Sequence, residues 1–308
     1  MILRSARILV VALLVAGCAA PGSPRSSGDV EPFPPTAEVE NLRLPFDAYT
    51  LSLAGLYIMA NAQDVLTREC MAARGHDWEI IERPTDLKDL RNRRRYGVIE
   101  MSIAERFGFH VPAGLLTPLD VEQRYDRRDN ALSESQQAAV SGADGCGREA
   151  ATRLRPEKSA DLDLLRKLDR ASLDDSQREQ RVVVAMDAWR DCVRSLGFDY
   201  QDPFAAMSDP RWWAADAAAA SNEEAAASSE EATASSGEST ASSEERAVAV
   251  AVVRCEEQTD LVAVWHAAEV KIQEEEIRRH PDYFRDLRAA TEAELAAAEA
   301  VLANSKLR

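Results

Sequence analysis

Cys-Met-Ala-Ala-Arg-Gly-His-Asp-Trp occupies residues 70–78, and Cys-Val-Arg-Ser-Leu-Gly-Phe-Asp-Tyr occupies residues 192–200. Both stretches read cysteine, four residues, glycine, one residue, aspartate and an aromatic residue. A second cysteine follows each stretch, at Cys146 and at Cys255. The chain therefore repeats a pattern that combines a helix end with a pair of cysteines.

Each stretch lies at the end of a predicted helix. From residue 52 to residue 74 the apolar residues recur at helical spacing, and Gly75 is placed to end that helix in a left-handed conformation. A second helix is predicted over 174–196, and Gly197 ends it in the same way. The similarity thus extends from the motif to the helix that carries it.

The expected fold is mostly α, because most of the remaining chain also shows helical periodicity. It is expected to consist of two similar helical units, over 45–156 and 157–308. A long helix is predicted over 242–279, and a closing helix is predicted over 282–303. With Pro281 between them, these two helices are expected to form an antiparallel hairpin at the end of the chain.

Two segments contain too few large apolar side chains to contribute to a core. Residues 18–44 are rich in Pro, Gly, Ser and Glu, and are expected to form a flexible tether. Residues 214–243 are nearly all Ala, Ser, Glu and Thr. They are expected to form a disordered or partly helical insertion in the second unit.

The N-terminus has the features of an export signal. Two arginines precede an apolar run at residues 8–16, which is too short to cross a bilayer core of about 30 Å. Val15-Ala16-Gly17-Cys18 then resembles the lipobox of bacterial lipoproteins, an aliphatic residue and two small ones before a cysteine. The resemblance implies that residues 1–17 are a signal peptide and that Cys18 carries a thioether-linked diacylglyceryl group. The alternative is an ordinary secreted protein that loses Cys18 with its signal.

With Cys18 assigned to the lipid, four cysteines remain, an even number that favours disulfides in an exported protein. Four cysteines allow three pairings. The repeated pattern favours one bridge within each unit, Cys70 with Cys146 and Cys192 with Cys255. Each bridge closes a loop of more than sixty residues. Such a loop stabilises the fold by roughly 4 kcal/mol in the loop-entropy model.

The charge balance limits the possible partners. The chain has 37 Lys and Arg residues against 53 Asp and Glu residues, a net charge of −16. Nucleic acids and anionic membrane surfaces repel such a protein, so no nucleic-acid partner is expected and membrane contact is expected only through Cys18. The histidines and cysteines do not have the spacing of metal ligands, and no dinucleotide or phosphate-binding motif occurs. Neither a metal nor a cofactor is expected.

The neighbouring side chains of His76 and Asp77 have the chemistry of an acid and base pair. The second copy of the pattern has Phe198 in place of His76. This substitution favours a structural role for the stretch, and the catalytic residues, if there are any, remain unknown.

The body of the chain resembles the uncharacterised, mostly helical secreted lipoproteins of high-GC Gram-positive bacteria, whose helices carry a Cys-x4-Gly-x-x-aromatic signature. The resemblance implies a location and a fold but no activity. The expected protein is lipid-anchored on the extracytoplasmic face of the cell membrane. It is a non-enzymatic binding or accessory module for another envelope protein or a cell-wall polymer. A secreted hydrolase that uses carboxylates with His76 or His110 is the alternative.

Overall fold

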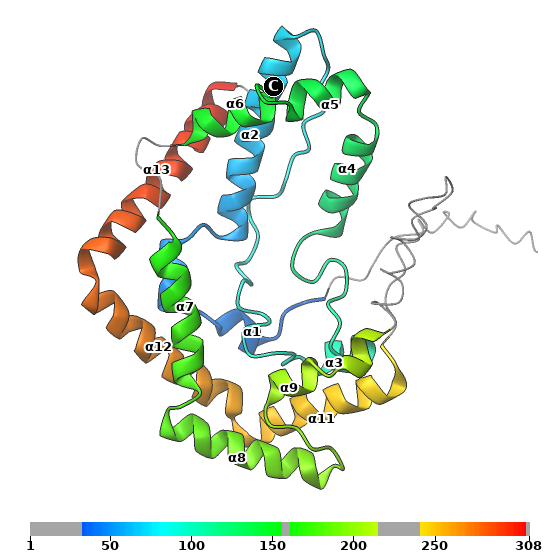
Figure 1. Cartoon of the computed structure of the whole chain (residues 1–308), viewed down its shortest axis with the longest axis vertical. Helices are drawn as coiled ribbons and strands as arrows, with labels where there is room; N and C mark the ends of the chain where they lie inside the picture. Colours follow the sequence, from blue (N-terminus) through cyan, green and yellow to red (C-terminus); the bar gives the residue numbers. More distant parts are fainter. Residues whose placement is uncertain (1–32, 156–160, 215–240, 306–308) are drawn as a thin grey trace, which may run out of the picture. The chain divides into compact units, whose positions relative to one another are not determined.

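The computed structural model describes residues 33–155, 161–214 and 241–305, and Figure 1 traces their path. In these ranges the regular structure is helical throughout and contains no strand, which confirms the mostly α fold. No helix in the same ranges is both long and apolar enough to cross a membrane. The predicted signal peptide, Cys18 and most of the predicted insertion lie outside the described residues.

The helices follow one another with mostly short connections. In chain order they are α1 (Ala37–Asn41), the 3₁₀ helix η1 (Pro45–Tyr49), α2 (Leu53–Ala73), α3 (Met101–Phe107), α4 (Leu119–Asn130), α5 (Glu134–Ser141), α6 (Cys146–Leu154), α7 (Asp163–Ser176), α8 (Gln180–Ser195), α9 (Pro203–Met207), α11 (Ser243–Thr259), α12 (Leu261–Arg279) and α13 (Pro281–Ser305).

The two repeated stretches form the same kind of helix end. The glycine has a φ of +80° at Gly75 and +92° at Gly197, a conformation that glycine adopts without steric cost. In both, the glycine N–H donates to the carbonyl three residues earlier at 3.0 Å. The next N–H donates to the carbonyl five residues earlier, at 2.9 Å in the first stretch and 3.2 Å in the second. These two bonds define the Schellman motif, so the glycine spacing identified both helix ends.

Both predicted disulfides are present. Cys70 is bonded to Cys146 and Cys192 to Cys255, with Cα–Cα distances of 5.6 and 5.7 Å. The bridges differ in their second partner, because Cys146 is the first residue of α6 whereas Cys255 lies well inside α11. The similarity of the two units beyond the helix ends and the bridges remains a prediction.

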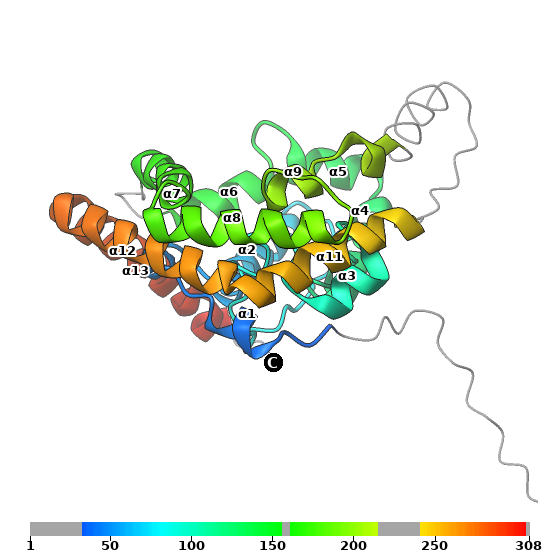
Figure 2. The ribbon, with the colours of Figure 1, turned by 90° about the horizontal axis from the view of Figure 1, so that it is seen from below.

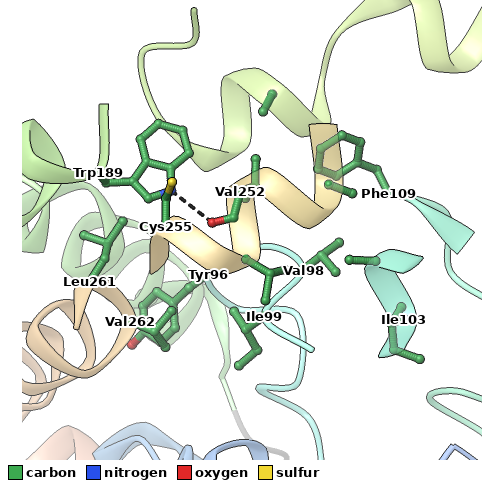
Figure 3. Close-up of a cluster of buried hydrophobic side chains, with 14 of the residues drawn as sticks. Tyr96, Val98, Ile99, Ile103, Phe109, Trp189, Val252, Cys255, Leu261 and Val262 are labelled. Atoms are coloured by element: carbon green, nitrogen blue, oxygen red, sulfur yellow. Dashed lines mark hydrogen bonds between the residues drawn. The ribbon is translucent and has the colours of Figure 1, made fainter. Parts of the chain in front are cut away.

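The largest apolar cluster draws residues from both predicted units (Figure 3). Tyr96 and Val98 come from the first unit, and Trp189 and Cys255 come from the second. The Trp189 indole is fully buried and donates a hydrogen bond to the carbonyl of Val252 at 3.3 Å. Helix α8 lies along α11 and α12 (Figure 2). Residues of 45–156 and of 157–308 therefore share one core.

The prediction of a flexible tether over 18–44 is wrong for residues 33–44, which are folded. Thr36 caps helix α1 by accepting a hydrogen bond from the N–H of Val39 at 3.3 Å. Val39, Leu42 and Leu44 are each 5% exposed or less. These three apolar side chains follow a proline-rich stretch, and the average composition of the segment concealed them.

The predicted helix over 242–279 is two helices. Asp260 separates α11 from α12 and has a φ of +51°, a left-handed conformation that Asp adopts more readily than most residues. The change of direction allows α11 to pack on α3 while α12 packs on α7. Helical periodicity continues across a single left-handed residue, so it did not reveal the break.

The predicted terminal hairpin is also wrong, because α13 packs mainly against α2 and not back along α12 (Figure 1). Ala298 of α13 lies in an apolar cluster with Ala62 and Leu66 of α2, and with Ala150 and Leu154 of α6. An apolar stripe shows that a helix has a buried face. It does not show which partner buries that face.

A polar network in the interior joins α7 and α12 to the turn before α3. Glu269 is completely buried and forms an ion pair with Arg95. Its carboxylate also accepts hydrogen bonds from Tyr96 at 2.8 Å, Ser172 at 3.1 Å and Gln273 at 3.2 Å. A buried carboxylate is tolerated when it is paired and hydrogen-bonded in this way. The network therefore fixes the mutual orientation of these segments.

Candidate functional site

A polar cluster near the surface is built around Asp64 on α2. Asp64 is 6% exposed, and its carboxylate accepts hydrogen bonds from Arg83 at 3.0 Å and Arg128 at 3.1 Å. The indole N–H of Trp78 donates to the same carboxylate at 3.3 Å. Asp64 thus fixes the segment after α2 and the end of α4 against α2.

Aromatic rings enclose the two guanidinium groups. The Arg128 guanidinium carbon lies 4.2 Å from the ring centroid of Trp78 and 4.7 Å from that of Tyr125. The corresponding distance from Arg83 to the Tyr125 ring is 4.3 Å. Burial lowers the pKa of Arg83, and the neighbouring Asp64 opposes that shift. Cation–π contacts and the shared carboxylate together offset the cost of burying two cations.

A depression of about 280 Å³ opens beside these aromatic rings and guanidinium groups, between residues of α2, α4, α5 and α6. Trp78, Tyr125 and Arg128 form part of its wall, and the side chains of Gln63 and Gln137 face it from other helices. The lining therefore combines aromatic rings, a guanidinium group and amide groups. This combination suits a ligand that has both a flat apolar face and hydrogen-bonding groups.

A second depression of about 330 Å³ adjoins the first, since Arg128 and Leu132 line both. Its charged lining is mixed and includes Arg124 and Arg127 together with Asp77 and Glu79 of the segment after α2. The two depressions together form what we call the aromatic–arginine site. An extended ligand with groups of both charges fits such a surface.

The sequence identified only the edge of this site. Asp77 lines the second depression, and its backbone carbonyl accepts a hydrogen bond from Gln136 at 3.2 Å. His76 is part of the helix end described above. The central residues Asp64 and Arg128 were missed. One signal was present, because Asn61 and Asp64 are three residues apart on the buried face of α2, and polar residues there require partners.

His110, the other predicted histidine, lies at a different place, against the first turn of α11. Its Nε2 is 3.4 Å from a carboxylate oxygen of Glu245, which is 2% exposed at its side chain. Glu245 also accepts a hydrogen bond from the N–H of Phe109 at 2.8 Å. The ring of Trp213 meets the His110 ring edge to face, with centroids 4.7 Å apart. The structure thus places Glu245 beside His110, a carboxylate that the sequence did not identify.

Glu256 on α11 is a buried carboxyl group of a different kind. It is 3% exposed, and neither side-chain oxygen has a hydrogen-bond partner within the described part of the chain. Burial raises the pKa of Glu256 well above its usual value, and the nearby charges of Glu38 and Glu257 raise it further. The protein therefore favours the neutral form of this group.

No group of three or more His, Cys, Asp or Glu residues in the described ranges is arranged to hold a metal ion. Comparisons of the chain with protein-family models, with curated proteins and with solved structures give no significant match.

Replacing Glu256 with Gln is expected to stabilise the protein increasingly as the pH rises. Because the pKa of Glu256 is raised in the folded protein, its carboxyl group contributes its full stabilisation at pH values below the unfolded pKa of about 4.5. This stabilisation is lost as the pH rises toward the folded pKa. Between the unfolded and the folded pKa of Glu256, the free energy of unfolding of the variant should rise relative to that of the wild type by about 1.4 kcal/mol for each pH unit. Urea denaturation at pH 5 and pH 7.5 measures it.

The matched control is Glu292→Gln, which removes an exposed carboxylate from α13. Its unfolding midpoint should follow that of the wild type at both pH values. A Glu256→Gln variant whose advantage does not change with pH would show that this carboxyl group titrates normally in the folded protein.

Proposed function

We propose that the protein is anchored by a lipid on Cys18 to the extracytoplasmic face of the cell membrane and acts there as a non-enzymatic binding module. The observation that best supports an extracytoplasmic location is the pair of disulfides, Cys70–Cys146 and Cys192–Cys255. Such bridges form and persist in oxidising compartments and are rare in the cytosol. The lipobox-like residues 15–18 support the anchor.

The ligand that we infer is a cell-wall glycopeptide fragment bound at the aromatic–arginine site. The exposed parts of Trp78 and Tyr125 are suited to contact with a sugar ring, and Gln63 and Gln137 can bond to its hydroxyl and amide groups. The neighbouring arginines pair with carboxylates of a short peptide. Two adjoining depressions with different chemistry support a ligand made of both parts, a sugar and a peptide.

A secreted hydrolase is the second candidate function, and the contact between His110 and Glu245 favours it. A carboxylate beside an imidazole can orient that ring and stabilise its protonated form during general base catalysis. However, Glu245 is also held by the N–H of Phe109, and His110 is only 8% exposed. A structural role accounts for both contacts. Loss of a measured turnover in a folded His110→Gln variant would favour the hydrolase.

The Cys18→Ala variant is expected to remain unlipidated, because the other four cysteines do not follow a lipobox-like stretch and are paired in disulfides. In cells supplied with a labelled fatty acid, the wild type should take up label and sediment with membranes. The variant should do neither. Ser27→Ala, a change outside residues 15–18, should behave as the wild type. Labelling of Cys18→Ala, or an unlabelled wild type, would contradict the anchor.

Binding of N-acetylmuramyl-L-alanyl-D-isoglutamine, a sugar–dipeptide, is expected at the aromatic–arginine site. With calorimetry on the full chain carrying Cys18→Ser, Gln137→Ala should weaken binding by about 1 kcal/mol, roughly fivefold, through the loss of one hydrogen bond. Arg127→Ala should weaken it by a similar or larger factor because the bond is charge-assisted.

The control for both variants is Gln123→Ala, since Gln123 is exposed on α4 and lines neither depression. It should leave the Kd unchanged. Absence of binding to the parent chain, or equal Kd values in all four proteins, would exclude this ligand from the site.

A further inference from the structure

An apolar groove of about 520 Å³ lies apart from the aromatic–arginine site and shares no lining residue with it. Seven leucines and Phe33 line the groove, and the leucines come from residues 51–56, 87–90 and 115–116. Its volume falls within the range of about 300–1,000 Å³ that is usual for ligand sites. Segments distant in the sequence therefore combine into one apolar surface.

Two of these leucines are unusually open to solvent. Leu56 is 52% exposed and Leu116 is 45% exposed, and both lie at the groove. Isolated exposed leucines are ordinary on protein surfaces. A continuous apolar surface that remains uncovered generally marks a place where another molecule binds.

The charged residues that line the groove are all cations. They are Lys88, Arg91 and Arg93, and no carboxylate is among the described lining residues, although the chain has a net charge of −16. Each cation pairs with a carboxylate outside the lining, and Lys88, with 63% of its side chain exposed, is the most open to solvent. A ligand with an apolar chain and an anionic head is complementary to this surface.

The position of the groove along the chain indicates where such a ligand would come from. Phe33 lines the groove and is the first described residue, fifteen positions after Cys18. Fifteen residues span at most about 50 Å when fully extended. If Cys18 is lipidated, as proposed above, the groove is held within that distance of the membrane surface, where lipids are concentrated.

We propose that this groove binds the acyl chain of a single-chain anionic lipid, such as a fatty acid released from the membrane. The acyl chain lies along the leucines and the carboxylate faces Lys88. The source of the lipid rests on the proposed membrane anchor, whereas the binding itself depends only on the groove.

Calorimetric titration of the full chain carrying Cys18→Ser with saturated fatty acids of eight to fourteen carbons, below their critical micelle concentrations, tests the proposal. Each added methylene should tighten binding about fourfold until the groove is filled. Leu56→Asp and Leu116→Asp should each weaken binding of the twelve-carbon acid at least tenfold. Because both side chains are about half exposed, the helical circular dichroism should not change.

The head-group contact is tested with Lys88→Glu. This variant should weaken binding of the twelve-carbon acid but leave binding of the twelve-carbon alcohol unchanged, because the alcohol carries no charge. Val184→Asp is the matched control for the leucine variants, since Val184 is 59% exposed on α8 and does not line the groove. It should bind the acid as the parent does.

Three results would overturn the proposal: affinity independent of chain length, equal weakening by Val184→Asp, or binding by the Cys18→Ser protein but not by the lipidated protein. The last result would mean that the protein's own acyl chains fill the groove. If no fatty acid binds in the titration, the groove proposal is wrong, but the labelling experiment at Cys18 still tests the anchor independently. Conversely, absence of label at Cys18 removes the proposed lipid source but not the binding.

Discussion

The two disulfides are the constraints on which the rest of the structure depends. Cys192–Cys255 fixes α8 against α11: Cys255 is buried in the main apolar core together with Trp189, and the partly buried Cys192 packs against that core. Cys70–Cys146 fixes the end of α2 against the start of α6, two helices that contribute to the wall of the aromatic–arginine site. Each bridge links segments more than sixty residues apart and so reduces the freedom of the unfolded chain.

Buried charges determine how the helices are oriented within that framework. Asp64 and Glu269 each accept hydrogen bonds from donors on other segments, so a shift of any one of these segments would cost a buried carboxylate at least one hydrogen bond. Glu256 is the contrasting case, because its carboxyl group has no partner in the described residues and burial raises its pKa. The interior thus specifies one arrangement through its paired charges, while one unpaired group makes stability depend on pH.

The sequence predicted those features that depend on neighbouring residues. The left-handed glycines at 75 and 197 identified two helix ends, and the repeated pattern around them gave the correct cysteine pairing. The predictions failed where the outcome depends on distant partners. The stripe on α13 could have been buried by α12 as well as by α2, and only the folded chain distinguishes these arrangements.

The candidate sites were largely invisible in the sequence for the same reason. Asp64 and Arg128 lie on separate helices, and neither belongs to a motif of fixed spacing. Trp78 ends the first repeated stretch, but that spacing indicates a helix end and does not show that the indole contacts Asp64. The groove likewise combines leucines from three segments, each of which looks like ordinary core periodicity or loop composition. The two sites offer different chemistry on one folded body, and we propose a wall fragment as the ligand of the polar surface and a lipid chain as the ligand of the apolar groove. A protein held at the membrane surface, below the wall, would meet both.

The central claim is that this helical protein is exported and is held together by two bridges in an oxidising compartment. Mass spectrometry of unreduced peptides from protein isolated from intact cells, with free thiols blocked at lysis, tests that claim most directly. The account predicts the linked peptides Cys70–Cys146 and Cys192–Cys255 and no blocked thiol at any of these four positions. Blocked thiols at these cysteines, or a peptide that links Cys70 to Cys192, would contradict it.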